Sequence, residues 1–308
     1  MRIVRCLFTA RTMQQTSAWI QASASVGRAR AVPWARACFT RDMRAPRFIV
    51  IALGLYLGLV LATGRAKAVS SPPPAAAELV RAALERSRLG FETGDATLAM
   101  RITDRRGRVL ERTLRSRTAL VDGGRRTRVT FLSPADQRGV ELLMIEDPEG
   151  ADQQYLYVPR YGQRRRVAGS AKNASFEGSD FTFADLESRD LRRGRFTRLP
   201  DGVYAKRPVR RVEIRPPADA PDERYAKVEL AIGADSGVPL EVRFFDRGGA
   251  LEKVLKVKRL AKTDGRYVPT KLVMSNLREG SSTTLEILDF DPDARPPASA
   301  LVPQALGR

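Results

Sequence analysis

A serine and an aspartate stand side by side in FEGSDFTFADLE, residues 176–187, among three phenylalanines. A serine next to a carboxylate suggests nucleophilic chemistry at Ser179, but the hydroxyl needs a base to activate it. The chain has no histidine, and its two cysteines, Cys6 and Cys38, lie far from this stretch near the N-terminus. Ser-His-Asp and Cys-His systems and zinc sites of the His/Cys kind are therefore excluded.

We predict a structural role for the Ser-Asp pair instead. Gly178 permits a tight turn, and either Asp180 or Thr182 can cap a short helix. Asp185 would then be the acidic residue that completes the cap from the first turn of that helix. The question becomes what the three phenylalanines cover.

Carboxylate chemistry remains possible without histidine, as in glycosidases or sites where oxygen ligands bind a metal. The densest acidic group, Glu146, Asp147 and Glu149, surrounds a proline and a glycine and is typical of a solvated turn. The sequence has no glycine-rich phosphate loop or dinucleotide fingerprint. We therefore expect a protein that is not an enzyme and uses no cofactor or metal. A hydrolase with two facing carboxylates stays open as an alternative.

The first 68 residues differ from the rest, with eleven basic side chains and a single acid. Met43 begins a pattern of basic residues, an apolar run of 16 residues and an A-x-A motif. This pattern predicts a signal peptide over residues 43–68, cleaved after Ala68, and export to the periplasm. We interpret residues 1–42 as an extension from a mis-assigned start.

Two other interpretations of this leader stay open. The apolar run could be retained as an anchor, although it is shorter than the roughly 20 residues that span a bilayer. The arginine-rich start could also be a mitochondrial transit segment. Residues 69–308 carry 43 basic and 34 acidic side chains, a net charge of +9, and no cysteine. An exported protein without a base-stacking module is not expected to bind nucleic acid.

After a proline-rich linker at residues 69–74, the spacing of apolar residues predicts a helix over residues 75–88. The apolar period then changes to two, with Gly, Pro and Asp between the runs. We count eleven or twelve strands, a central insertion at residues 173–191 and a flexible tail at 291–308. A mainly β, antiparallel meander that closes on itself is the expected fold for residues 75–290.

One face of these strands is rich in charge. Examples are Arg210, Arg211 and Glu213 in one strand and Glu252, Lys253, Lys256 and Lys258 in another. We place these side chains outward, where they would protect sheet edges. An outer-membrane barrel would need an apolar outer face, so the pattern argues against one.

The run from Thr130 to Leu191 resembles the outer-membrane lipoprotein-sorting family, the LolA-like periplasmic carriers, in its poorly characterised branch. The residues that carry the likeness are Pro134, Gly139, Tyr157-Val158-Pro159, Arg165-Arg166-Val167, Phe176, Gly178-Ser179-Asp180-Phe181 and Asp185-Leu186. A second stretch, VPLEVRFFDRGGALEKVLKVKRLAKTDGRYVPTKLVMSNLREGSSTTLEI, is similar to the C-terminal half of that family.

This resemblance implies an unclosed antiparallel β-barrel of about eleven strands, capped by helices, with acyl chains on its concave face. It also implies a periplasmic carrier or chaperone that moves lipids or lipoproteins between the inner and outer membranes. Members of this branch often accompany RND or MMPL-type exporters. The alternative is thus an accessory protein that docks on such an inner-membrane transporter without lipid cargo.

We expect the first helix and the central insertion to form a lid over the cavity. The candidate cavity and lid residues are Phe131, Leu143, Tyr155, Tyr157, Phe176, Phe181, Phe183 and Leu186. The alternative is that most of them are permanent core.

The basic residues Arg164, Arg165 and Arg166 have two functional interpretations. They could contact anionic head groups at the rim, or they could bond lid carbonyls and lock the closed state. An ordinary solvated strand end is the alternative. The expected partners are lipid or lipoprotein acyl chains and, transiently, a membrane surface, for a monomeric protein.

Overall fold

The computed structural model describes residues 75–87, 93–147, 152–187, 194–217, 224–263 and 265–308. The predicted leader, residues 1–68, and the linker at 69–74 lie outside the described residues. Within the described ranges, none of the helical segments has the length and apolar character needed to cross a bilayer.

Thirteen strands form one antiparallel sheet, and the fold is mainly β as the sequence predicts. The strands are β1 (Gly94–Thr103), β2 (Val109–Val121), β3 (Gly124–Ser133), β4 (Glu141–Ile145), β5 (Gln153–Val158), β6 (Gln163–Val167), β7 (Arg195–Tyr204), β8 (Arg207–Arg215), β9 (Lys227–Gly233), β10 (Pro239–Phe245), β11 (Leu251–Thr263), β12 (Arg266–Asn276) and β13 (Ser281–Asp291). Short 3-10 helices are η1 (Pro159–Tyr161), η2 (Gly169–Asn173), η3 (Ala184–Leu186), η4 (Ala298–Ala300) and η5 (Pro303–Ala305).

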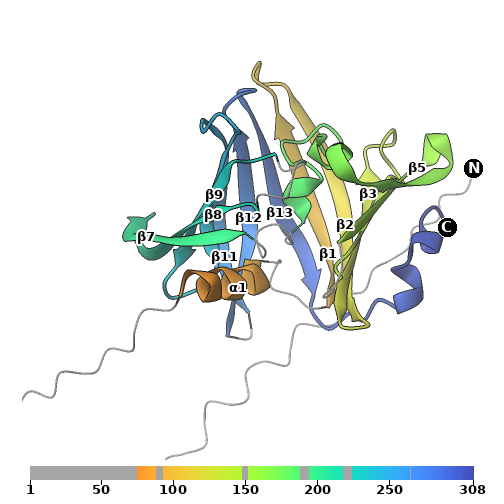
Figure 1. Ribbon diagram of the computed structural model, residues 1–308. Helices are drawn as coiled ribbons and strands as arrows, with labels where there is room; N and C mark the ends of the chain where they lie inside the picture. Colours follow the sequence, from red (N-terminus) through yellow and green to blue (C-terminus); the bar gives the residue numbers. More distant parts are fainter. Residues whose placement is uncertain (1–74, 88–92, 148–151, 188–193, 218–223, 264) are drawn as a thin grey trace, which may run out of the picture. The chain divides into compact units, whose positions relative to one another are not determined.

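The sheet consists of two meanders, β1–β6 and β7–β13, joined where β1 pairs with β13. Met100 lies opposite Leu285 at this central pair. The strands β6 and β7 are the two edges, so the sheet is not closed into a barrel. The chain must therefore travel from one edge to the other between β6 and β7, and the central insertion lies on that path (Figure 1).

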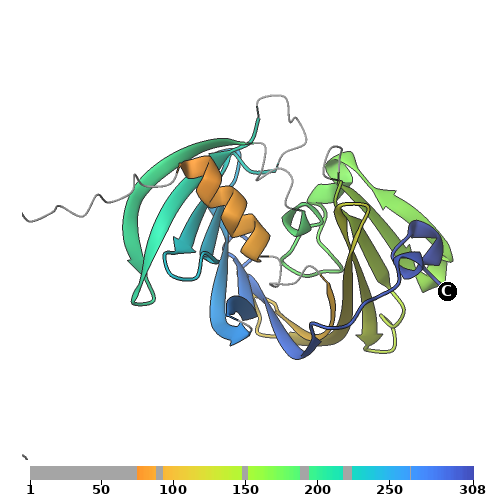
Figure 2. The ribbon, with the colours of Figure 1, turned by 90° about the horizontal axis from the view of Figure 1, so that it is seen from below.

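The sheet is strongly curved, and its two halves face each other (Figure 2). The helix α1 (Ala76–Ser87) and the central insertion lie between these halves (Figure 2). The helix packs against β7, β8, β10 and β12, which confirms the helix predicted from the apolar spacing. Leu79, Val80, Ala83 and Leu84 form its buried face, because they recur at helical spacing.

The C-terminal tail is not loose, so the expectation of a flexible segment at residues 291–308 is wrong. Leu301 and Leu306 are buried with Ala119 and Leu143 on the outer surface of the first meander (Figure 2). The tail covers apolar side chains that would otherwise face water, and their burial favours its ordered position.

A buried ion pair fixes the tail in place. Arg128 donates to the Glu141 carboxylate at 2.6 Å, and its other terminal nitrogen donates to the Ala300 carbonyl at 3.2 Å. The second Glu141 oxygen accepts the backbone N–H of Gly307 at 2.9 Å. Both ends of the pair therefore hold the tail through its backbone, which sequence patterns do not reveal.

Gly307 offers a test of this docking. Its φ is +77°, and a Cβ placed there would lie 2.5 Å from the Tyr157 ring. Gly307→Ala is expected to reduce the free energy of unfolding by about 1–3 kcal/mol more than Gly249→Ala, because it adds overpacking to backbone strain. Gly249 has a φ of +83° and no heavy atom within 4 Å of the added Cβ, so it isolates the strain. Equal losses in urea unfolding would contradict the docking.

Candidate functional site

The central insertion folds into a tight loop and a short 3-10 helix. Glu177 and Gly178 adopt left-handed φ angles of +47° and +74°, which turn the chain back on itself. The backbone N–H of Phe176 then donates to the carbonyl of Phe181 at 2.7 Å. The turn predicted at Gly178 is confirmed.

A reciprocal cap follows this turn. The Thr182 hydroxyl accepts the backbone N–H of Asp185 at 3.2 Å, and the Asp185 carboxylate accepts the backbone N–H of Thr182 at 2.8 Å. This is the arrangement of a capping box, at the start of η3. Of the two predicted caps, Thr182 is the one observed, and Asp180 is left for another contact.

The three phenylalanines of the insertion point into the concave face. The ring of Phe176 lies 5.6 Å from the rings of both Phe131 and Phe183, in the cluster of the first meander. Phe181 belongs instead to the cluster that contains α1 and the second meander. Leu186 packs against both clusters. The insertion therefore joins the two halves of the apolar interior.

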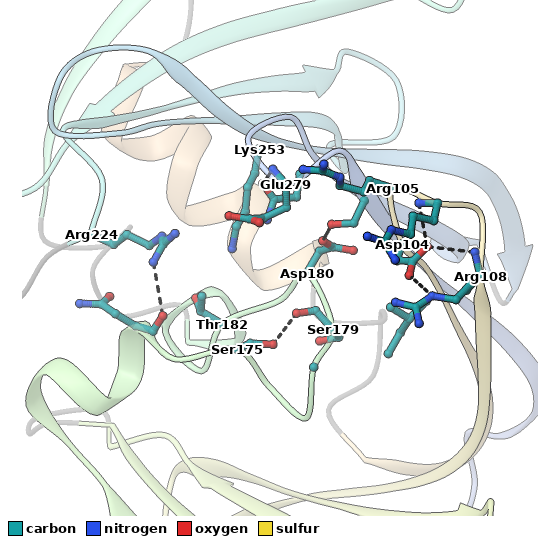
Figure 3. A pocket seen from close by; sticks show the side chains of 16 residues that line it. Asp104, Arg105, Arg108, Ser175, Ser179, Asp180, Thr182, Arg224, Lys253 and Glu279 are labelled. Atoms are coloured by element: carbon teal, nitrogen blue, oxygen red, sulfur yellow. Dashed lines mark hydrogen bonds and ion pairs between the residues drawn. The ribbon is translucent and has the colours of Figure 1, made fainter.

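Asp180 holds the insertion to β13 (Figure 3). Thr283 donates its hydroxyl to the Asp180 carboxylate at 2.6 Å and accepts the backbone N–H of Asp180 at 2.9 Å. Ser281 donates its hydroxyl to the other carboxylate oxygen. All of these groups are at least half-buried, and Thr283 is fully buried. Asp180 is an anchor, in agreement with the structural role predicted for the Ser-Asp pair.

Asp185 forms a second anchor. Its carboxylate accepts from the Lys253 ammonium at 3.1 Å and from the Tyr225 hydroxyl at 2.9 Å. Burial raises the pKa of Tyr225 well above its ordinary value, and the Asp185 carboxylate raises it further, so the phenol remains a donor. The side chains of Lys253 and Asp185 are only 2% and 1% exposed. The expectation that Lys253 faces outward is wrong.

Two arginines bond carbonyls of the insertion from the surrounding walls. Arg112 on β2 donates to the carbonyl of Glu177, and Arg224 donates to the carbonyl of Asn173 at 3.4 Å. Arg224 also pairs with Glu252. These residues make the contact to lid carbonyls that we expected from the basic residues of β6.

An apolar cavity of about 370 Å³ lies beneath the insertion and α1. Phe181 and Leu186 of the insertion and Leu84 of α1 line it from above. The wall from the second meander consists of Val228, Leu230, Val238, Pro239, Val242, Phe244, Leu255, Val257, Pro269, Leu272, Leu285 and Phe290. Among the described residues of this half, 224–263 and 265–308, Tyr225 is the one polar side chain in the cavity lining.

A second, polar cleft of about 640 Å³ is lined by a different set of insertion residues (Figure 3). Its lining includes Ser175, Asp180 and Thr182 of the insertion together with Arg105 and Lys253. Residues of the insertion line both spaces, so this segment separates them. The Asp185–Lys253 ion pair crosses the partition, because Lys253 lines the cleft and Asp185 lines the apolar cavity.

Comparison with solved structures and families identifies the fold. A domain from Vibrio parahaemolyticus named as outer-membrane lipoprotein-sorting is 27% identical over 74% of this chain and 98% of its own, with a TM-score of 0.68. The chain belongs to the LolA-like, outer-membrane lipoprotein-sorting family. A family model described as an uncharacterized protein matches residues 123–308.

Two further structures share the fold of this LolA-like protein. A DUF1329 family protein from Desulfovibrio piger is 23% identical over 74% of this chain and 97% of its own, with a TM-score of 0.66. A LolA superfamily protein from Nitrosomonas europaea is 16% identical over 75% of this chain and 98% of its own, with a TM-score of 0.59. No curated protein matches the chain.

The predicted cavity residues of this LolA-like protein separate into three groups. Phe181 and Leu186 line the apolar cavity. Phe131, Phe176 and Phe183 are buried in the adjoining cluster of the concave face. Their assignment to a cavity or to permanent core stays a prediction.

The third group lies on the outer face of the sheet, not on the concave face. Leu143, Tyr155 and Tyr157 pack with the C-terminal tail on the outer surface, so their assignment to the concave cavity is incorrect. Adjacent residues of a strand point to opposite faces, and Leu142 and Leu156 are the residues of β4 and β5 that point inward.

The basic residues Arg164, Arg165 and Arg166 are exposed on the edge strand β6. Arg164 donates to the carbonyl of Pro303 in the C-terminal tail at 3.2 Å, not to the insertion. A rim contact with a membrane stays a prediction for these residues.

The sequence reasoning missed Lys253, Tyr225, Arg112 and Gln154 as contacts of the insertion. The reciprocal Thr182 and Asp185 spacing was a usable signal, but their partners come from distant strands. The described residues contain no group of three or more His, Cys, Asp or Glu side chains placed to bind a metal ion. The carboxylates of Asp180 and Asp185 are both occupied as hydrogen-bond acceptors.

Lys253→Met tests the buried anchor, because it leaves the Asp185 carboxylate without its cation. Loss of one partner of a buried pair costs about 3–5 kcal/mol, so the free energy of unfolding should fall by that amount. Adding Asp185→Asn to Lys253→Met should recover part of the loss, since the buried charge is then removed.

Lys271→Met is the matched control. Lys271 pairs with Glu286 at 2.7 Å, but the two side chains are 33% and 26% exposed. Its loss should stay below about 1 kcal/mol. Equal losses for Lys253→Met and Lys271→Met in chemical denaturation would refute the anchor.

Proposed function

We propose that this LolA-like protein is an exported carrier that binds acyl chains of lipids or lipoproteins. It acts in the periplasm, where it takes its cargo from the inner membrane and releases it at the outer membrane. The apolar cavity holds the chain, and α1 and the central insertion are its movable cover.

The observation that carries this proposal is the apolar cavity under a cover of loop and helix. Its volume of about 370 Å³ is at the lower end of the roughly 300–1,000 Å³ typical of small-molecule sites. One wall of the cavity is continuous apolar sheet, which suits a flexible hydrocarbon chain. The cover would move to enlarge the space for a long chain.

Energetics favour such an arrangement for a carrier. Each buried CH₂ contributes about 0.8 kcal/mol relative to water, so a long chain binds strongly to any dry cavity. The carrier exchanges its cargo with membranes, where the chain is already buried, and release requires a near-balanced transfer. A cover whose Phe181 fills the space when cargo is absent supplies that balance, because cargo and cover compete for the same apolar wall.

Two further observations support the proposal. The Vibrio parahaemolyticus domain carries lipoprotein sorting in its name. The pattern of basic residues, apolar run and A-x-A motif at residues 43–68 is typical of a signal peptide, which would bring the protein to the periplasm.

Leu272→Trp tests the cavity directly. Leu272 lines the cavity, and a tryptophan there would occupy the space intended for the chain. Wild-type protein should take up a fluorescent long-chain fatty acid, and Leu272→Trp should bind it at least about ten-fold more weakly, a loss of about 1.4 kcal/mol. Val273→Trp places the same ring on the opposite face of β12 and should bind like wild type.

Failure of the wild-type protein to bind the probe, with no lipid in organic extracts of protein purified from the periplasm, would overturn the carrier. That result would favour an accessory protein without lipid cargo.

Thr283→Val tests the cover. The substitution removes the hydroxyl that both donates to and accepts from Asp180. Loss of these bonds destabilises the closed state, so the open state becomes more populated and fatty-acid uptake should be roughly five-fold faster. Amide hydrogen exchange in residues 175–183 should also be faster.

Thr284→Val is the matched control, because it makes the same change at the next residue, on the other face of β13. It should leave both rates unchanged. An unchanged or slower uptake in Thr283→Val would show that the insertion is permanent core.

A further inference from the structure

Gln154 is a buried polar side chain at the apolar cavity. It lies on β5, is fully buried, and lines the cavity beside Met144 and the insertion. Its side-chain nitrogen donates to the backbone carbonyl of Phe183 at 2.8 Å. Its side-chain oxygen is also buried but has no hydrogen-bond partner. Buried polar atoms in native proteins are nearly always hydrogen-bonded, so this oxygen needs an explanation.

The orientation of this amide is fixed by its neighbour. Exchange of the nitrogen and oxygen would place the Gln154 oxygen 2.8 Å from the Phe183 carbonyl oxygen, and two acceptors repel at that distance. The group left without a partner is therefore the carbonyl, which can only accept. Its partner must be an N–H or an O–H donor.

The cavity is polar at the end where Gln154 lies and apolar at the other. The first meander contributes Ser116 and the hydroxyls of Thr118 and Thr127, which lie 3.1 Å apart. The second meander contributes the apolar wall described above. A ligand that satisfies both ends has a hydrocarbon chain along β9–β13 and a polar group beside β2, β3 and β5.

The fixed charges at the polar end disfavour an anionic group. The carboxylates of Glu146, Asp152 and Glu187 line the cavity there, against the single guanidinium of Arg125. Lys172 pairs with Glu187 at 2.7 Å from outside the lining. The carboxylates outnumber the cations around this end, so an anionic group would meet net repulsion, whereas a neutral donor would meet acceptors.

We propose that Gln154 selects the cargo, and that its side-chain oxygen accepts a hydrogen bond from an uncharged hydroxyl or amide N–H attached to the acyl chain. The inference rests on the proposed function, because it assumes that a chain enters the cavity, and it narrows the cargo to long-chain molecules with such a donor. The acyl chain follows the apolar wall, and the donor is held between Gln154 and the hydroxyls of β2 and β3.

The experiment compares dodecanol with dodecyl methyl ether as competitors for a bound fluorescent long-chain alcohol. The two have the same dodecyl chain, but only the alcohol can donate a hydrogen bond. Wild-type protein should prefer the alcohol by about five-fold, the effect expected of one neutral hydrogen bond. Gln154→Met keeps the length of the side chain and removes the acceptor, so this preference should fall to about one.

The ratio of the affinities for the alcohol and the ether separates recognition of the hydrogen-bond donor from any general loss of binding caused by the substitution. Gln154→Met also loses the contact to Phe183, which changes the binding of both probes alike and leaves their ratio unaffected. Gln163→Met, on the exposed edge strand β6, should keep the preference of the wild type.

Each contrary outcome has a distinct meaning. Binding of both probes to wild-type protein without preference would show that Gln154 accepts no hydrogen bond from the cargo, and would overturn the inference alone. A preference that survives in Gln154→Met would also overturn it. Absence of binding by dodecanol, by the ether and by the fluorescent alcohol alike would overturn the carrier function and this inference with it.

Discussion

The concave face of the sheet is apolar across both meanders, and the structure depends on how that face is covered. A second sheet would cover it with backbone that is already paired, but this protein uses a helix and a loop. A buried loop carries backbone groups and turn residues that need partners. Asp180, Asp185, Arg112 and Gln154 make such contacts, each to a different part of the insertion or its surroundings. The polar contacts of the site are thus a consequence of burying a loop inside a curved sheet.

Most of the fold follows from local patterns. The change of apolar period from helical spacing to two predicts α1 and most of the strands, because most of them bury one face. The strand that the sequence patterns do not predict is β7. Its hairpin to β8 turns at Ala205 and Lys206, which adopt φ angles of +47° and +65° without the Gly, Asn or Asp that mark such turns. In addition, β7 contains Pro200, Asp201 and Gly202, a sequence typical of a turn and not of a strand.

The site was less predictable, for two physical reasons. The first is that β4 and β5 are covered on both faces, and the charged neighbours of Leu143 on the outer face, Glu141 and Arg128, are themselves buried as an ion pair. That cover comes from a tail more than 140 residues away in sequence, whose proline-rich composition suggested disorder. The second is long-range pairing. Lys253 lies on the same face of its strand as Leu251 and Leu255, and this face points inward. A buried lysine could be predicted there only if its ion-pair partner were known. That partner, Asp185, is 68 residues away in sequence.

The arrangement of the two spaces around the insertion explains how a polar anchor can also be a reversible one. Asp180 and Lys253 face the polar cleft, so water reaches these groups as soon as the insertion moves, and the net contribution of their bonds to the closed state is small. Water cannot replace the contacts of Phe181 in the same way, because Phe181 packs against the apolar wall. Opening is therefore unfavourable chiefly because the apolar wall loses its contact with Phe181 and gains only water. An acyl chain can replace that apolar contact. The polar contacts define where the cover rests, and the apolar contacts determine what can displace it.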